Sequence, residues 1–377
     1  MSVLKIKEAP VNRKRLKFID MARSVAILLM LEGHFVDDSL MDVYRDHDNI
    51  IFSTWYWIRG FTAPVFLTVT GLIFTYLLLQ KRDEPYFSNL RVKKGFKRVV
   101  ELFFWGYMLQ WYSFHVLECI AVGIFSILII FLIYKLIKVI PLWIYFMFAG
   151  MILFTSFLYF QNMPDDRQWL PFDVSFLESF FHGAKNKSIF PIVPWMGYTM
   201  FGAMIGALLH SAHKIVTKYY FAAIFIIVGF VLYHHAHQLL EMIDAIWESI
   251  SGRNPKIVRV NWLYNRLGMV FMELGGLMLI DKLLGKKIND NSLFLKVGQN
   301  TLTIYILHMI LLYGSILGFG LNKYCHKNLN PTQVTIGAIL FITFFVILIK
   351  YLDQIKGKLS FILVPISKFF NRLFRVN

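Results

Sequence analysis

The chain has 377 residues, of which 57% are hydrophobic, 17% aromatic and only 16% charged. Soluble domains are about 45 to 50% apolar and roughly one quarter charged, so this composition excludes a soluble globular enzyme. The net charge of +16 would suit a nucleic-acid-binding protein, but apolar runs of bilayer length exclude that class and assign the positive charge to cytoplasmic loops.

Ten apolar segments approach the roughly 20 residues that a transmembrane helix needs. The sequence therefore predicts an all-α polytopic membrane bundle of about ten transmembrane helices. The first segment is not a cleavable signal peptide, because charged residues interrupt it and no small-residue cleavage site follows. The segments lie near residues 18–36, 57–79, 97–115, 117–134, 139–160, 189–209, 219–236, 263–281, 293–318 and 333–350.

Loop charges predict the orientation of this bundle. Alternate loops on one side, including both termini, carry 26 Lys and Arg, against 9 in the loops of the other side. The positive-inside rule therefore places both termini in the cytoplasm and turns the loops 37–54, 161–188 and 237–262 outward. Residues 1–355 are expected to form one integral-membrane domain. Residues 356–377 form a basic cytoplasmic tail that is either an amphipathic interfacial helix or solvated.

The first segment contains the densest group of polar residues. A charged side chain at membrane depth costs roughly 2.5 to 3.5 kcal/mol on insertion scales, so each is a functional candidate. Asp20 and Arg23 are three residues apart and should pair on one helix face. Eleven helical steps from Arg23 to His34 return to within about 20° of the starting direction over a rise of about 16 Å. Glu32 points almost the opposite way and should serve a different neighbour.

This spacing has a chemical use. A cation at the cytoplasmic mouth could hold an anionic donor, and an imidazole near the outer face could take a proton from an acceptor hydroxyl or amine. His34 is the expected base and Arg23 the donor-site cation. The alternative is a packing salt bridge together with a hydrogen-bonded histidine.

The sixth segment reads FPIVPWMGYTMFGAMIG. Pro191 and Pro194 should break its regular hydrogen bonding, and irregular backbone at this depth is tolerated only against protein or a wet cavity. Gly202 and Gly206 form a GxxxG pair that permits close helix approach. Trp195 could border the cavity or serve as an aromatic-belt anchor.

The eighth and ninth segments contain further polar groups. Arg266 and Glu273 are seven residues apart on one face, which favours a structural pair. Thr301, Tyr305 and His308 share one face of the ninth segment. His308 could line a site or simply bond a neighbouring carbonyl.

No metal site is expected. The histidines 234, 235 and 237 have poor ligand spacing, and two cysteines, Cys119 and Cys325, are too few for a structural zinc site or a disulfide framework. Hydrolase, Walker, zincin and dinucleotide motifs are absent from the sequence.

Four blocks carry a family resemblance. They read RLKFIDMARSVAILLMLEGH, WIRGFTAPVFLTVTGLIFTYL, FPIVPWMGYTMFGAMIGALL and GQNTLTIYILHMILL. In this order they resemble the heparan-α-glucosaminide N-acetyltransferase catalytic-domain family, within the integral-membrane acyltransferases that include the acyltransferase-3 proteins. The resemblance spans most of the chain. It implies a membrane enzyme that moves an acyl group, usually acetyl, from cytoplasmic acyl-CoA to a saccharide or glycan-linked acceptor on the extracytoplasmic side.

The acyltransferase-3 pattern of Arg, ten residues and His is matched by Arg23 and His34, and Asp20 is also family-like. The resemblance thus implies a catalytic set of His34, Arg23 and Asp20. The lysosomal branch has Asn where His34 stands and its catalytic His in the following outward loop, where His47 is the only histidine here. We favour His34 as the base, with His47 as the alternative. Ser24 replaces the glycine usual after the motif Arg.

The basic stretch before the third segment resembles an arginine-bearing stretch of the family. Arg91, Lys94 and Arg98, with Arg23, are therefore expected to bind the phosphates of acyl-CoA, although positive-inside topology alone would also explain them. Tyr305, His308, Trp195 and His47 are expected on the acceptor side.

The sequence therefore predicts a multi-pass acyltransferase of the cytoplasmic (inner) cell membrane that uses acetyl-CoA and no metal. Its expected partners are acyl-CoA, a saccharide or lipid-linked glycan and the lipid bilayer, without nucleic acid; a homodimer is left open. The alternative functions are a transporter or flippase of a lipid-linked or small polar substrate, and a non-catalytic scaffold.

Overall fold

The computed structural model describes residues 16–110, 114–161, 180–181, 188–212, 215–216 and 218–358. Within these ranges the chain is all helical, as expected, and contains no strand, only an isolated bridge between Leu40 and Leu329. The helices are α1 (Lys17–Ser39), α2 (Ile50–Arg59), α3 (Thr62–Leu79), α4 (Leu90–Leu109), α5 (Val116–Ile137), α6 (Leu142–Gln161), α8 (Ile192–Ser211), α9 (Tyr219–Ser251), α10 (Asn261–Leu284), α11 (Leu293–Gln299), α12 (Thr301–Tyr313), α13 (Asn322–Cys325) and α14 (Pro331–Lys358).

Six stretches of the described chain are long and apolar enough to cross a membrane. They are Ile50–Leu79, Val116–Ile137, Leu142–Phe160, Ile192–Ser211, Tyr219–Ser251 and Pro331–Leu352. The other four expected segments coincide with α1, α4 and α10, which are helices containing charged residues, and with the α11–α12 pair. Ten spans therefore remain a prediction. The tail from 359 onward, and residues 1–15, lie outside the described residues.

The ninth expected segment is divided rather than continuous. Asn300 has φ −110° and ψ 28°, which ends α11 and lets α12 begin at Thr301. Gly298 approaches α1 closely just before this break, since an added Cβ would meet the Asp20 carbonyl. Gly314, with φ +70°, ends α12. Periodicity alone could not show this break, because both halves are apolar and helical.

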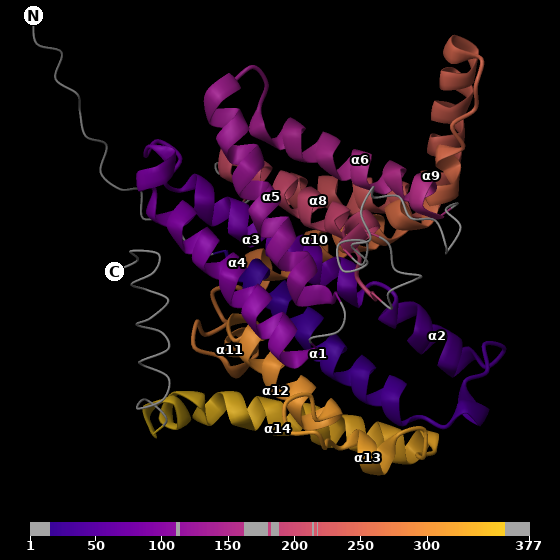
Figure 1. The fold of residues 1–377 in the computed structure, drawn as a ribbon, viewed down its shortest axis with the longest axis vertical. Coiled ribbons are helices and arrows are strands. Elements are labelled where there is room, and N and C mark those ends of the chain that lie inside the picture. Colours follow the sequence, from indigo (N-terminus) through magenta and orange to yellow (C-terminus); the bar gives the residue numbers. More distant parts are fainter. Residues whose placement is uncertain are drawn as a thin grey trace, which may run out of the picture.

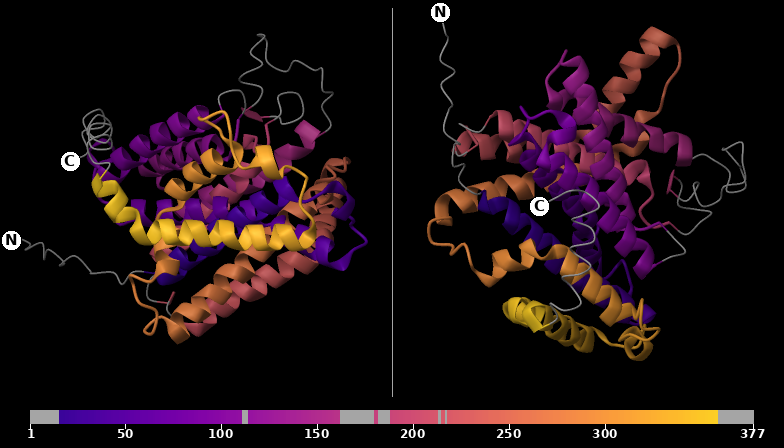
Figure 2. Two further views of the ribbon diagram at one scale, coloured as in Figure 1. Left: turned by 90° about the horizontal axis from the view of Figure 1, so that it is seen from below. Right: turned by 60° about the vertical axis from the view of Figure 1, so that its left-hand side comes forward.

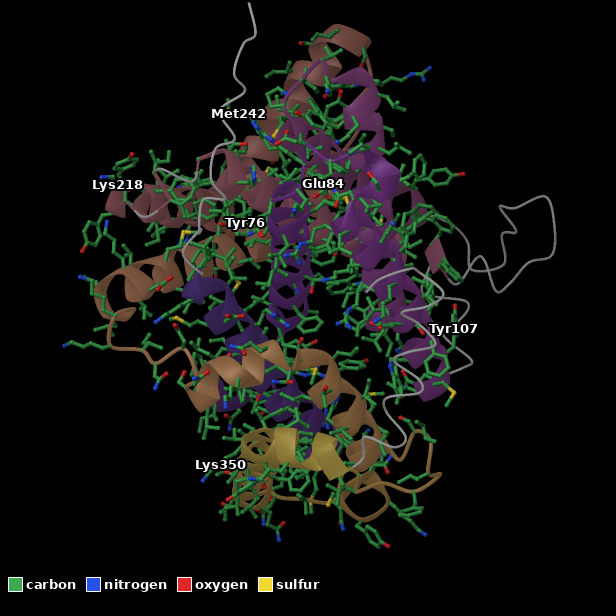
Figure 3. All side chains as sticks on the ribbon, turned by 90° about the vertical axis from the view of Figure 1, so that its left-hand side faces the viewer. Tyr76, Glu84, Tyr107, Lys218, Met242 and Lys350 are labelled. Atoms are coloured by element: carbon green, nitrogen blue, oxygen red, sulfur yellow. The ribbon has the colours of Figure 1, made fainter. Side chains whose placement is uncertain are left out.

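Helix α1 is the central element. In Figure 1 it runs through the middle of the bundle, with α14 along one side beyond α11 and α12, and both views of Figure 2 keep α14 on the outside. Figure 3 shows the exposed Lys218 and Lys350 at the periphery, around a densely filled interior. The elements that contact α1 are α2, α3, α10, α11, α12, α13 and α14.

Helices α3 and α8 approach each other closely. A Cβ at Gly202 would meet the Thr68 carbonyl, and one at Gly206 the Leu72 carbonyl, so the GxxxG pair acts as predicted. The expected backbone break near Pro194 is also present, because Val193 has non-helical φ −99° and ψ 121°. Of the most apolar stretch of α8, 89% is buried inside the protein, so this helix belongs to the core and does not face lipid.

The substitution Gly202→Ala tests this contact against Gly276→Ala. Both variants add one methyl group inside a helix, but a Cβ at Gly276 meets nothing within 4 Å. We expect Gly202→Ala to lower the free energy of unfolding by about 1 to 3 kcal/mol, as overpacking does, and Gly276→Ala to leave it unchanged or slightly raised. Thermal unfolding of the detergent-purified proteins measures both. Equal stability of the two variants would contradict the close approach of α3 and α8.

Candidate active site

The polar face of α1 meets α12. Arg23 Nη2 donates a hydrogen bond to Thr301 Oγ1 at 3.1 Å, and Arg23 Nη1 lies 3.8 Å from Asp20 Oδ1. The predicted Asp20–Arg23 pair is therefore present. It fixes the guanidinium at the first turn of α12.

Two turns further along α12, His34 and His308 form a second contact. His34 Nδ1 and His308 Nε2 are 3.0 Å apart, and the ring of Tyr305 lies edge-on to that of His308 with centroids 4.9 Å apart. His308 is completely buried, whereas His34 is half-buried. Arg23 and His34 thus contact the same helix, as their shared face on α1 predicts. The face of α12 that bears Thr301, Tyr305 and His308 is confirmed as well.

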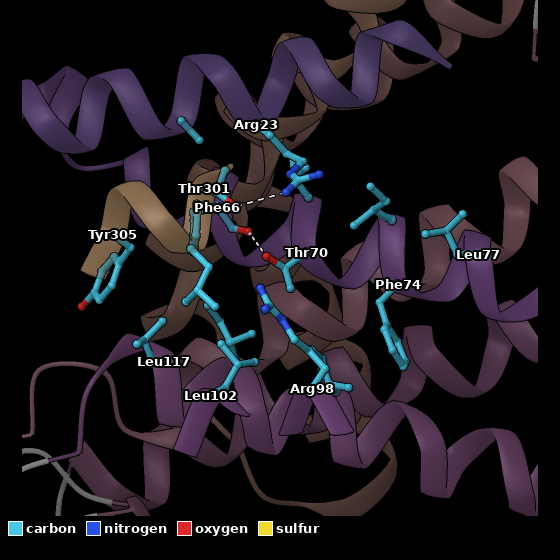
Figure 4. Close-up of a pocket in the computed structure, with 16 residues that line it drawn as sticks. Arg23, Phe66, Thr70, Phe74, Leu77, Arg98, Leu102, Leu117, Thr301 and Tyr305 are labelled. Atoms are coloured by element: carbon cyan, nitrogen blue, oxygen red, sulfur yellow. Dashed lines mark hydrogen bonds between the residues drawn. The ribbon is translucent and has the colours of Figure 1, made fainter. Parts of the chain in front are cut away.

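A cavity of about 170 Å³ lies between α1, α3, α4, α5 and α12. Figure 4 shows Arg23 and Arg98 reaching into it from helices on opposite sides, with Thr70 between them. The Thr70 hydroxyl is engaged with the Phe66 carbonyl at 2.8 Å. Two guanidinium groups that share a small cavity favour an anion between them, because an anion relieves their mutual repulsion and accepts charge-assisted hydrogen bonds.

The rest of the cavity wall is mainly apolar. Among the described residues, only Thr301 and Tyr305 bring polar side chains to it besides the two arginines and Thr70. The cavity therefore joins a cationic part, at Arg23 and Arg98, to the part of α12 that leads to His308. Its lining suits a ligand with an anionic group and an apolar or weakly polar part.

Only one of the three basic residues expected on α4 reaches this cavity. Arg98 lines it and lies 3.6 Å from Glu101. Arg91 and Lys94 stand about two turns and one turn earlier on α4, respectively, and are not among the lining residues; Lys94 is exposed. Asn89 caps this helix by accepting from the backbone N–H of Arg91 at 2.8 Å.

An ion network lies at the end of α1 beyond His34. Asp37 accepts from Arg59 Nη2 at 2.7 Å through one oxygen and from Arg45 Nη1 at 3.3 Å through the other. The proximity of Arg59 to Gly33, where an added Cβ would lie 3.4 Å from Arg59 Nε, depends on the fold and not on spacing within one helix.

Glu32 points away from this face. It accepts a hydrogen bond from Trp55 Nε1 at 2.7 Å, which confirms that it serves another neighbour. Arg59 also covers the ring of Trp55 at 5.8 Å. The Glu32–Trp55 and Asp37–Arg59 contacts therefore tie α2 to the C-terminal part of α1.

Two expected acceptor-side residues are not brought to the α1–α12 contact. His47 is exposed, and its ring packs against the rings of Phe52 and Tyr56 with centroids 5.2 and 4.9 Å apart, respectively. Trp195 packs against Phe190 at 4.9 Å and does not line the cavity between Arg23 and Arg98.

The expected Arg266–Glu273 pair does not form. Arg266 instead lies over the ring of Trp262 at 4.9 Å, and neither carboxylate oxygen of Glu273 has a hydrogen-bond partner among the described residues. Glu273 borders a second, apolar cavity with Val25 and Leu29 of α1. These positions lie on the face of α1 turned away from Arg23 and His34.

Ser24 has a structural role that the sequence did not reveal. Its hydroxyl donates to the Phe294 carbonyl and accepts from the backbone N–H of Gly298 at 3.0 Å. The side chain that replaces the usual family glycine therefore joins α1 to α11. This contact sets the position from which α12 begins.

Comparison with known proteins adds the decisive observation. The family model described as "Heparan-alpha-glucosaminide N-acetyltransferase, catalytic" matches residues 15–240. The chain belongs to this family. Membership implies an acetyltransferase embedded in a membrane, in agreement with the apolar helices. No curated protein and no solved structure matches the chain.

The matched region of this heparan-alpha-glucosaminide N-acetyltransferase family member contains Arg23, His34 and Arg98. Helix α12, with Thr301, Tyr305 and His308, lies beyond it, so the partners of the motif residues come from the fold. Across the described ranges no group of three or more His, Cys, Asp or Glu side chains is placed to hold a metal ion.

The substitution Ser24→Ala tests the α1–α11 joint, with Ser53→Ala as a matched control. Ser24→Ala leaves the buried Gly298 N–H without its partner, which should cost about 1 to 3 kcal/mol of unfolding free energy. The Ser53 hydroxyl donates to the Ile50 carbonyl in an exposed position, so Ser53→Ala should lower the free energy of unfolding by less than about 0.5 kcal/mol. Thermal unfolding in detergent reports both values. An undiminished stability of Ser24→Ala would show that this joint is dispensable.

Proposed function

We propose that the protein transfers an acetyl group from cytoplasmic acetyl-CoA to a saccharide or glycan-linked acceptor at the extracytoplasmic side of the cell membrane. The observation that carries this proposal is the arrangement along α1: Arg23 and His34 face the same helix, and a cavity with two arginines adjoins it. Family membership supports the acetyl-transfer chemistry.

Arg23 and Arg98 would hold the phosphates of the donor by charge-assisted hydrogen bonds. The pantetheine arm would then extend through the mainly apolar cavity towards Tyr305. Walls of this kind limit water around a thioester and therefore limit its hydrolysis. Asp20, 3.8 Å from Arg23, would orient the guanidinium.

His34 would act as the general base. In the tautomer in which His34 Nδ1–H donates to His308 Nε2, the other ring nitrogen, His34 Nε2, bears a lone pair and can accept a proton from the acceptor. The half-buried position of His34 leaves this nitrogen a route to a substrate, while the hydrogen bond to His308 holds the ring in place.

Membrane topology completes the proposal. Ten spans with both termini in the cytoplasm would place the α1 end near Arg23 inside and the end near His34 outside. The charged helices α1, α4 and α10 would then cross the bilayer within the bundle, where their polar groups find partners. Donor and acceptor would thus approach from opposite sides.

The transporter alternative has one observation in its favour: the carboxylate of Glu273, beside an apolar cavity, has no hydrogen-bond partner within the described part of the chain. An intramembrane acid of this kind suits a proton-coupled carrier. A product that forms only in the presence of the thioester separates the two functions.

Radiolabelled acetyl-CoA supplied to membrane vesicles with a lipid and glycan extract of the host tests the proposed reaction. We expect label in the extract with the wild type, and a roughly 10²- to 10⁴-fold loss with His34→Gln, the typical contribution of general base catalysis. His235→Gln, at an exposed position on α9, should transfer label like the wild type.

His47→Gln is the rival variant in the same assay. Its near-normal transfer would agree with His34 as the base. Full transfer by His34→Gln together with loss in His47→Gln would contradict the assignment, and thioester-independent movement of a substrate would favour a carrier.

The donor site is tested by Arg98→Gln beside Arg82→Gln. Arg98 lines the cavity, whereas Arg82 is exposed and lies 3.6 Å from its neighbour Asp83. Loss of one hydrogen bond to a charged group costs about 1.5 to 3 kcal/mol, so the KM for acetyl-CoA should rise roughly 10- to 100-fold in Arg98→Gln and stay constant in Arg82→Gln. An unchanged KM in Arg98→Gln would remove this arginine from the donor site.

A further inference from the structure

Acceptor binding does not explain the position of His308. His308 is completely buried behind the half-buried His34, and it lies between His34 and Tyr305. A group placed in this way is screened from a substrate that reaches His34. Its ring nitrogens can nevertheless receive and release protons.

The proposed transfer requires a proton to move along this line. The acceptor loses a proton at the outer end when its nitrogen or oxygen bonds to the acetyl carbon. The carbon–sulfur bond breaks with its electron pair on sulfur, and the CoA thiolate must gain a proton at the other end. The bond changes therefore leave one proton at His34 and require one at the sulfur.

We propose that His308 and Tyr305 form an inward proton relay from His34 to the sulfur of the donor; the inference rests on the proposed acetyl transfer. His34 Nε2 accepts the proton of the acceptor, and His34 passes its Nδ1 proton across 3.0 Å to His308 Nε2. His308 then holds the positive charge in a fully buried position, which is costly, so it must pass a proton on.

The outlet is His308 Nδ1, which has no side-chain hydrogen-bond partner among the described residues. The adjacent Tyr305 lines the same cavity as Arg23 and Arg98, where the donor would lie. A phenol hydroxyl both accepts and donates, so Tyr305 gives its proton to the thiolate and regains one from His308. No proton is lost or gained along this path.

The outward route from His34 is less suitable. Asp37 lies three residues beyond His34 on α1, and its two oxygens accept from Arg59 and Arg45. A carboxylate paired with two guanidinium groups is a poor proton acceptor. Arg59, positively charged beside this end of α1, also disfavours the departure of a proton in that direction.

Proton counting in inside-out membrane vesicles tests the relay. The lumen, which corresponds to the extracytoplasmic side, contains D-glucosamine and the pH-sensitive dye pyranine, and acetyl-CoA is added outside. At about pH 6, well below the pKa of its amine, glucosamine enters the reaction as an ammonium ion, so it releases one proton on becoming the amine. The relay predicts one lumenal proton per N-acetylglucosamine formed. Two lumenal protons, with one taken up outside, would overturn it.

Two variants test the named residues. His308→Gln keeps an acceptor for His34 Nδ1–H but cannot pass a proton, and Tyr305→Phe removes the hydroxyl alone. Each is expected to lower kcat without raising the KM for acetyl-CoA and to raise the count from one proton to two. A count that stays at one in an active variant overturns the role of that residue. If a variant is inactive, the wild-type count alone decides.

Failure of the underlying function has a different signature. A wild type that forms no N-acetylglucosamine contradicts the proposed acetyl transfer, and the relay falls with it. A wild type that forms the product with two lumenal protons leaves the acetyl transfer intact and overturns only the relay.

Discussion

The contact between α1 and α12 is the interaction on which the site depends. A helix that carries Arg23 and His34 in an apolar bundle must find polar partners inside the protein, because lipid offers none. Helix α12 supplies both, Thr301 for the guanidinium and His308 for the imidazole. The two hydrogen bonds lie about 10 Å apart along α12 and fix its register on α1.

The neighbouring helices hold α1 and α12 in this relative position. The break at Asn300 divides α11 from α12, and Ser24 holds α11 against α1 through the N–H of Gly298. On the other side of the cavity, the close approach of α3 to α8 at Gly202 gives α3 a rigid backing. One wall of the cavity, α3, is therefore closely packed from behind, which favours a dry thioester site.

Much of this arrangement follows from helical geometry. The shared face of Arg23 and His34, the different partner of Glu32 and the close approach at Gly202 each depend on positions within one helix, so the sequence predicts them. The six apolar stretches follow from composition in the same way.

Other features depend on which helices become neighbours. Arg98, rather than Arg91 or Lys94, faces the cavity because of the rotation of α4 against α5, which a basic run does not encode. Asp37 meets Arg59 only after α2 folds back on α1. The separation of Arg266 from Glu273 has the same origin, since Arg266 has the ring of Trp262 as its neighbour instead.

A cryo-EM structure of the complex with a thioether analogue of acetyl-CoA would test the donor site most directly. We expect the analogue between α1, α3, α4 and α12, with phosphate oxygens at hydrogen-bond distance from Arg23 and Arg98 and the acetyl end beside His34. An analogue bound outside this cavity, or one whose acetyl end lies beside the exposed His47, would contradict the assignment of the site.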